Sequence, residues 1–270
     1  MSDQDPKKSP DDPESDASMS VWEHLDELRA RLVKSIAAIF LLFLGALFFS
    51  NEILEFLKIP VNDLLPEGKN LGFKDVVEPF MVTLKVSFLA ALIASCPIWF
   101  FQFWKFIEPA LYPEERKYIF PFSIASMVLF IVGTSFCFWV ILPMALEFLI
   151  EWGKQFAEPD ITVHGYVSFL TLMVIGFGLV FEAPLILVVL SLLGVVDYPT
   201  LVSARRYVIV GCFVVSAMVT PPDWISQIGM AVPLYFMFEV SLLIIKYLGR
   251  KKEKEDEEGA AEESDAKQTS

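Results

Sequence analysis

The chain has 270 residues, of which 55% are hydrophobic and 14% aromatic, and its mean hydropathy is +0.54. This composition is too apolar for a soluble domain and predicts an integral membrane protein. Its 21 basic and 34 acidic residues give a net charge of −13. That charge leaves no net basic surface and excludes general nucleic-acid binding.

Two charged ends flank the apolar body of the chain. Residues 1–18 and 251–270 contain too few apolar residues for burial to offset the entropy of ordering them. We therefore expect a disordered acidic N-terminal extension over 1–18, a transmembrane domain over 19–250 and a disordered charged tail over 251–270. Because the first segment has no apolar core, we do not expect it to be a cleavable signal peptide.

Six apolar segments predict six transmembrane helices. Ser20 and Glu23 have the spacing of a capping box, and the helix that begins there continues into the first segment. The fifth segment covers only about fourteen residues, or about 21 Å of helix, which is short of a hydrocarbon core about 30 Å thick. We expect either a thinner bilayer there or a helix that is not fully exposed to lipid. The six segments lie at roughly 32–50, 80–104, 118–142, 166–193, 207–220 and 225–248.

Prolines inside several apolar segments predict bent helices. Pro97, Pro121, Pro184 and Pro233 each remove a backbone donor, and neighbouring helices can satisfy the freed carbonyl groups. The expected fold is therefore all-α, with six kinked transmembrane helices in a concave bundle.

Basic residues near the segment ends predict the orientation of the bundle. The N-terminal end, the second and fourth connections and the C-terminal end carry most of the Lys and Arg. The first, third and fifth connections carry few, and the excess marks the first side as cytoplasmic. Both termini are therefore predicted to be cytoplasmic.

Catalytic and metal-binding patterns are weak. The tripeptide from Gly133 to Ser135 superficially resembles the serine motif of intramembrane proteases, but no histidine lies in a neighbouring segment to act as its base. Two histidines far apart, with no cysteine cluster, leave too few ligands for structural zinc. The three cysteines are interpreted as reduced packing residues. We expect no enzyme activity, no metal and no cofactor.

Two acids flank an apolar cytoplasmic surface. Glu27 lies in the segment HLDELRARL, and Glu115 follows an aromatic-rich helix end that contains Phe106. Glu27 is either a binding group or half of an i,i+4 pair with Arg31. Glu115 is either a binding group or a solvated loop charge beside Arg116. The aromatic residues form either a binding groove or an interfacial belt.

Glu182 lies near the middle of the fourth apolar segment, in GFGLVFEAP. A charged carboxylate there costs about 2.5–3.5 kcal/mol, so a partner or a proton is required. Glu182 is either protonated or faces a polar cavity or another polypeptide, and the alternative is a purely structural hydrogen bond within the bundle. Glu239 in the sixth segment is interpreted similarly, and Lys85 in the second is expected to extend outward along the helix.

Four motifs resemble those of the TatC family, the polytopic component of the twin-arginine protein translocase. They are HLDELRARL, FWKFIEPALYPEER, FGLVFEAP and VTPPDWISQ, in the family's order and at its span positions. The resemblance covers nearly all of residues 19–250, and only the two tails depart from it.

The resemblance implies a non-enzymatic core receptor that binds twin-arginine signal peptides of folded proteins. It implies that Glu27, Glu115 and Phe106 bind the signal peptide, and that Glu182, Thr220 and Gln227 contact single-span partners of the TatA and TatB kind. It further implies an oligomeric complex, energy from the transmembrane proton gradient, and a location in the cytoplasmic (inner) membrane rather than the thylakoid membrane. Guanidinium suits such acids because its planar fork binds a carboxylate through two hydrogen bonds.

A second functional class stays open from the residues alone. Glu182 could serve a proton-coupled secondary transporter as its intramembrane titratable site. The three hairpins of the chain share no motif, which speaks against the inverted repeats common among such transporters.

Overall fold

The computed structural model describes residues 21–62, 64–65, 70–111, 116–158, 160–220 and 224–268, and within these ranges the side chains of 21–23, 110, 219 and 248–268 are left out. The described chain is helical, with one isolated bridge between Gly72 and Thr162, so the all-α prediction is confirmed. Ser20, Glu115 and residues 1–18 lie outside the described residues.

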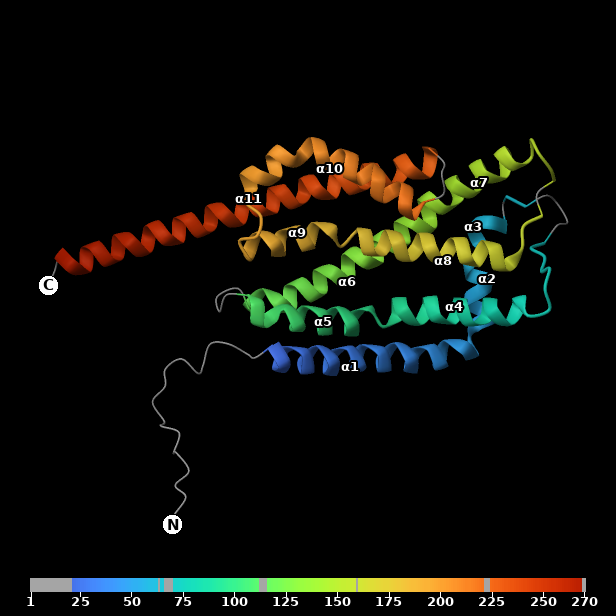
Figure 1. Cartoon of the computed structure of the whole chain (residues 1–270), viewed down its shortest axis with the longest axis horizontal. Coiled ribbons are helices and arrows are strands. Elements are labelled where there is room, and N and C mark those ends of the chain that lie inside the picture. Colours follow the sequence, from blue (N-terminus) through green and yellow to red (C-terminus); the bar gives the residue numbers. More distant parts are fainter. Residues whose placement is uncertain are drawn as a thin grey trace, which may run out of the picture.

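Six apolar crossings run back and forth along the long axis of the molecule (Figure 1). Five are helices long and apolar enough to span a membrane, and a bent pair forms the sixth. The start of α1 and the end of α11 lie at the same end of the bundle. In chain order the crossings are α1 (Val21–Phe48), α4 (Glu78–Ala94) with α5 (Cys96–Ile107), α6 (Ile119–Phe136) continuing through a π-helical turn (Cys137–Ile141) into α7 (Leu142–Gly153), α8 (Val163–Val180) with α9 (Ala183–Leu192), α10 (Tyr198–Val219) and α11 (Trp224–Gln268).

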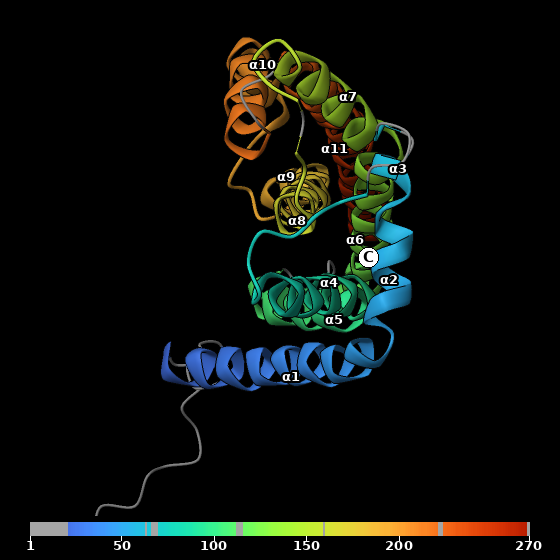
Figure 2. The same ribbon diagram turned by 90° about the vertical axis from the view of Figure 1, so that its right-hand side faces the viewer.

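The bundle is curved when it is viewed along its helices (Figure 2). Helices α1 and α10 lie at the two ends of the curve, α6, α7 and α11 lie along its back, and α8 with α9 lies inside it. Short 3₁₀ turns, Glu108–Ala110 and Arg116–Tyr118, flank the loop between α5 and α6. The sequence therefore predicts the six-helix architecture correctly.

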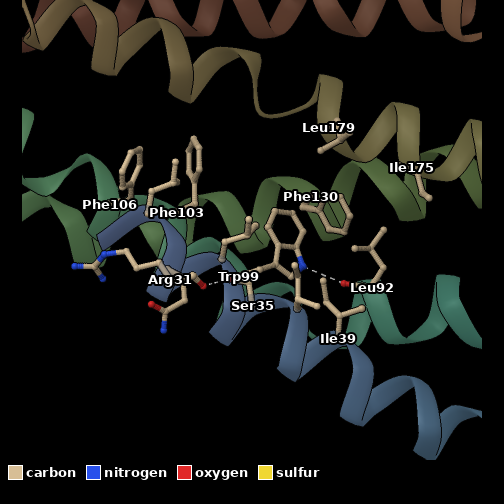
Figure 3. A pocket seen from close by; sticks show the side chains of 14 residues that line it. Arg31, Ser35, Ile39, Leu92, Trp99, Phe103, Phe106, Phe130, Ile175 and Leu179 are labelled. Carbon is tan, nitrogen blue, oxygen red and sulfur yellow. Dashed lines mark hydrogen bonds between the residues drawn. The ribbon is translucent and has the colours of Figure 1, made fainter. Parts of the chain in front are cut away.

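Two breaks in the crossings have a proline directly after them, but not every proline of the apolar segments marks a break. Pro97 and Pro184 occupy the second position of α5 and α9, where a missing N–H leaves no helical hydrogen bond unmade. The α4–α5 break bends the crossing by 56°, and Trp99 Nε1 donates a 3.1 Å hydrogen bond back across it to the Leu92 carbonyl (Figure 3). Pro121 lies in the first turn of α6, so the expected kink there is wrong.

The fifth crossing is longer than the apolar run predicts. Helix α10 has 22 residues, or about 33 Å, which is enough to span the hydrocarbon core. Arg205 and Arg206 end the apolar run without ending the helix, and Arg205 donates a 2.8 Å hydrogen bond to Glu239 of α11. The expectation of a short fifth span is therefore wrong. The two arginines lower the local hydropathy, but the helix continues through them.

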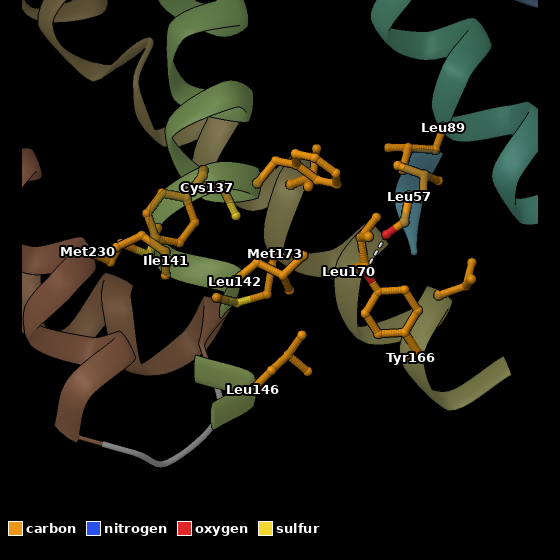
Figure 4. Packing of buried hydrophobic residues seen from close by; sticks show 14 of the residues in the cluster. Leu57, Leu89, Cys137, Ile141, Leu142, Leu146, Tyr166, Leu170, Met173 and Met230 are labelled. Atoms are coloured by element: carbon orange, nitrogen blue, oxygen red, sulfur yellow. Dashed lines mark hydrogen bonds between the residues drawn. The ribbon is translucent and has the colours of Figure 1, made fainter. Parts of the chain in front are cut away.

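The largest buried cluster lies where α4, α7, α8 and α11 meet (Figure 4). Two short helices, α2 (Ser50–Leu57) and α3 (Ile59–Asn62), join it from the connection after α1. The buried Tyr166 hydroxyl of α8 donates to the Leu57 carbonyl, which fastens α2 to the bundle. This cluster stabilises the end of the bundle opposite the start of α1 and the end of α11.

Helix α11 continues to Gln268, through most of the segment for which the sequence analysis expects no fixed structure. The extension projects away from the other helices (Figure 1). Its Ala, Glu and Lys residues have high helix propensity, which favours a helix in this segment.

Candidate functional site

An apolar groove of about 380 Å³ lies between α1 and α5 and is closed at its floor by α6 and α8 (Figure 3). Helix α1 supplies residues at helical spacing, so that one face of it lines the groove. Tryptophan and phenylalanine side chains of α5 form the opposite wall. The lining residues are Leu28, Arg31, Leu32, Ser35, Ile36, Ile39, Leu92, Trp99, Gln102, Phe103, Phe106, Phe130, Ile175 and Leu179.

Glu27 and Arg31 form an ion pair at the rim of this groove. Arg31 Nε donates to Glu27 Oε1 at 2.9 Å, and a second guanidinium nitrogen contacts the same oxygen. Only 21% of the Glu27 side chain and 14% of the Arg31 side chain are exposed. The i,i+4 interpretation of Glu27 is therefore confirmed. Its role in binding a signal peptide stays a prediction.

Phe106 closes the rim by stacking on His24. Their ring centroids are 4.5 Å apart with 23° between the planes, which joins the first turns of α1 to the last turn of α5. The sequence analysis considered His24 only as a metal ligand and missed this contact. Its position three residues before Glu27, on the same helix face, is the signal that could have identified it.

The structure brings Glu27 and Phe106 to one end of the groove, and Glu115 lies outside the described residues. Glu115 belongs to the loop between α5 and α6. Helix α5 ends, and helix α6 begins, at this same end of the bundle (Figure 1). A carboxylate at the end of an apolar groove suits a peptide whose cationic residues precede an apolar stretch.

Glu182 lies at the break between α8 and α9, and only 6% of it is exposed. The Ser126 hydroxyl of α6 interacts with its carboxyl, and Trp104 Nε1 of α5 donates a 2.7 Å hydrogen bond to the same hydroxyl. Glu182 Oε1 has no hydrogen-bond partner among the described residues. The structure therefore shows a polar cluster inside the bundle with one acceptor left unsatisfied, which is costly in a low-dielectric site.

Thr220 and Gln227 flank the turn between α10 and α11. The buried Thr220 hydroxyl donates to the Ser216 carbonyl at 2.8 Å, and Gln227 Nε2 donates to the Phe213 carbonyl at 3.3 Å. These contacts stay within the α10–α11 hairpin. Among the described contacts, none joins either residue to Glu182.

Two charged residues of the apolar segments have partners within the bundle. Lys85 Nζ donates to Ser168 Oγ at 2.7 Å and lies 3.2 Å from His164 Nε2, between α4 and α8. Glu239 does not resemble Glu182, because it accepts 2.8 Å hydrogen bonds from Arg205 and from Tyr235. Ser168, His164 and Arg205 lie on other helices, so spacing within one apolar segment does not reveal these partners. Tyr235 lies four residues before Glu239 on α11, and this spacing could have identified it. No group of three His, Cys, Asp or Glu residues in the described ranges could hold a metal ion.

Comparison with known proteins identifies the family. The model of the family "Sec-independent protein translocase protein (TatC)" matches residues 23–233. The protein of that name from Escherichia coli K12 is 36% identical over 234 residues, covering 86% of this chain and 91% of the relative. Those from Campylobacter jejuni and Aquifex aeolicus are 40% and 39% identical, covering 87% of this chain and 97% and 98% of the relatives.

Solved structures agree with the sequence comparison. A crystal structure described as the twin arginine translocase receptor TatC, in the detergent DDM, matches with a TM-score of 0.73 and 37% identity. The match covers 83% of this chain and 99% of that one. A second crystal structure of the same description matches with a TM-score of 0.71. The chain is therefore a multi-pass membrane protein that belongs to the TatC family of Sec-independent protein translocase proteins.

Proposed function

We propose that this protein is the core receptor of a twin-arginine translocation system in the cytoplasmic membrane, and that it acts by binding rather than by catalysis. Its ligand is the twin-arginine signal peptide of a folded protein, which docks at the cytoplasmic face. The relatives named above are Sec-independent translocase proteins, and the matched crystal structure is described as a twin arginine translocase receptor.

The observation that carries this proposal is the position of the Glu27 carboxylate beside Arg31 at the apolar α1–α5 groove. A signal peptide has a cationic segment followed by an apolar one. In our account the apolar segment lies in the groove against Phe103 and Leu32, while an arginine reaches Glu27 beside Phe106. Glu115, in the neighbouring loop, receives the second arginine. Two separated acids then read two guanidinium groups.

In the Glu27–Arg31 pair, the Arg31 side chain competes with an arginine of the peptide for the Glu27 carboxylate. Both contacts of Arg31 fall on Glu27 Oε1, so a peptide guanidinium can bind this carboxylate through two hydrogen bonds only by taking that oxygen from Arg31. Exchange of one arginine for another keeps the carboxylate paired throughout. Selectivity over lysine follows from the planar two-point geometry of the guanidinium.

The partner site is proposed at Glu182, Thr220 and Gln227, for single-span subunits of the TatA and TatB kind in an oligomeric complex. Glu182 is almost fully covered, so a partner helix must replace the Ser126 contact or separate α6 from α9 to reach it. The unsatisfied Oε1 favours such an incoming donor. The proton gradient across the membrane is proposed as the energy source, with no cofactor.

The alternative of a proton-coupled secondary transporter has less support. It rests on Glu182 alone, whereas the family match extends over residues 23–233 and includes the groove. We therefore favour the receptor.

A crosslinking experiment tests the proposed binding mode. A twin-arginine signal peptide with a photoreactive group in its apolar segment is bound to the purified full-length protein, and the labelled positions are identified by mass spectrometry. We expect labels on α1 and α5 at Leu32, Ser35 and Phe103. Labels confined to the outer face of α10 or to α7 would contradict the proposal.

A further inference from the structure

A second apolar groove, of about 710 Å³, lies on the back of the bundle between α6, α9 and α11. Helix α9, a short helix that follows a break, forms the floor of this groove, and α6 and α11 lie on either side of α9 (Figure 2). The groove does not belong to the α1–α5 site, with which it shares no lining residue. Its walls are apolar, formed by side chains such as Phe120, Ile124, Val128, Val188, Val240 and Ile244.

The groove is about one leaflet deep. On α6 it extends from Phe120 to Leu129, or about 14 Å of helix, whereas one leaflet of hydrocarbon is about 15 Å thick. The antiparallel α11 contributes Met237 to Ile244 over a similar depth. A transmembrane helix of a partner needs about 30 Å of contact to be covered along its length. The dimensions therefore suit an acyl chain better than a spanning helix.

Two cations lie at the mouth of the groove. Arg116 and Lys117 are exposed in the 3₁₀ turn directly before α6, where residues three apart share a face, so Lys117 lies above Phe120 of the groove and Arg116 lies beside it. Within the described part of the chain, no ion pair includes either residue. Lys117 Nζ lies 5.3 Å from the ring centroid of the adjacent Tyr118, whereas Lys246 Nζ, at the same end, lies 6.0 Å from the ring centroid of Tyr198 at the start of α10.

We propose that this groove is a binding site for an anionic phospholipid of the adjacent leaflet. One acyl chain lies between α6 and α11 over α9, and the headgroup phosphate binds Arg116 and Lys117. Guanidinium and ammonium donors bind phosphate oxygens through charge-assisted hydrogen bonds, and basic residues at the membrane surface attract anionic lipid. The site is independent of the receptor function proposed above.

Lipid retention by the purified full-length protein tests this site. The protein is exchanged into detergent with phosphatidylglycerol or phosphatidylcholine of identical acyl chains, and bound lipid is counted by native mass spectrometry. We expect phosphatidylglycerol to bind at least tenfold more tightly than phosphatidylcholine. The double variant R116Q/K117Q should abolish that preference, and the matched variant K246Q, which removes a charge at the same end, should preserve it.

A groove-filling pair of variants tests the position of the acyl chain. V128W places an indole in the groove from its exposed rim, whereas V132W adds the same side chain one turn farther along α6, outside the lining. We expect V128W to reduce retention of phosphatidylglycerol at least tenfold and V132W to leave it unchanged, with wild-type melting temperatures for both.

Three results would overturn the proposal. The first is equal retention of the two lipids by the unaltered protein. The second is a V128W variant that retains phosphatidylglycerol normally. The third is a photoreactive phosphatidylglycerol whose labels fall outside residues 116–129, 184–188 and 237–244, or a single-span subunit that crosslinks through position 128 and displaces the lipid.

Discussion

Glu27 shows how one residue can satisfy both a structural and a functional interpretation. Its carboxylate pairs with Arg31 one turn away, as the spacing predicts, and it also lies on the rim of a groove that the spacing does not reveal. The internal pair keeps a half-buried acid compensated until a peptide guanidinium replaces it.

The variant Arg31→Gln tests this competition. Removing the competitor should strengthen binding of a twin-arginine peptide about two- to fivefold, because partly exposed pairs of this kind contribute about 0.5–1 kcal/mol. The measurement is a fluorescence titration of labelled peptide. Lys34→Gln, which removes a charge from the same helix without touching Glu27, is the control and should change affinity little. Weaker binding in Arg31→Gln alone would show that Arg31 assists rather than competes.

Glu182 carries a different prediction, because it lies inside the bundle. Gln keeps an acceptor for Ser126 and a similar volume, so Glu182→Gln should retain the wild-type melting temperature. Glu182→Ala should leave signal-peptide affinity unchanged and reduce disulfide crosslinking of the complex to its single-span partners at least severalfold. If Glu182→Ala loses peptide binding while staying folded, the separation of the two sites is wrong.

The sequence predicts candidate residues better than their contacts. Glu182 is conspicuous as a charge in an apolar segment, but Ser126 and Trp104 come from two other helices and carry no local signal. The same reason explains why the partners of Lys85 were not predicted.

At the scale of helices, prolines predict the α4–α5 and α8–α9 breaks because they lie in the first turn after each break. Pro143 marks the start of α7 after the π-helical turn in the same way, and the sequence analysis did not use it. The true length of α10 was missed because hydropathy was used as a measure of helix length. The distance between two packed helices also cannot be predicted from the sequence of one of them alone.

The α6–α8 crossing depends on such a close approach. A Cβ atom at Gly178 would lie 2.6 Å from the buried Phe130 ring and 2.8 Å from Thr134. Gly178→Ala should therefore destabilise the folded bundle by about 1–3 kcal/mol. Gly211→Ala in α10, where no atom lies within 4 Å of the added methyl group, is the matched control. Thermal unfolding in detergent compares the two. Equal melting temperatures would show that α6 and α8 can separate at no cost.

For the whole molecule, the sequence predicts six crossings, and in the described residues the start of α1 and the end of α11 lie at one end of the bundle. Which end faces the cytoplasm follows only from the basic residues, since the fold itself does not define a side. The orientation therefore stays a prediction, as do the roles of Glu115 and of the tails.

Cysteine labelling in intact cells tests the orientation. Lys154→Cys, just after α7, should react with a membrane-impermeant thiol reagent, and Arg116→Cys should react only after lysis. The native Cys96, Cys137 and Cys212 are buried and give little background. The reverse pattern would invert the proposed orientation.

The proposed receptor function depends on Glu27 and Glu115 at the cytoplasmic end, each binding one arginine of the signal peptide. Its most direct test is the affinity of the purified protein for a twin-arginine signal peptide and for the twin-lysine form, each with wild type and with Glu27→Ala/Glu115→Ala. Each lost charge-assisted hydrogen bond is worth about 1.5–3 kcal/mol, so the double variant should bind the twin-arginine peptide about 100-fold more weakly or worse. Glu147→Ala/Glu151→Ala, which removes two charges at the opposite end, should bind normally. Wild-type affinity in a folded Glu27→Ala/Glu115→Ala variant, or equal binding of the arginine and lysine peptides by wild type, would contradict this account.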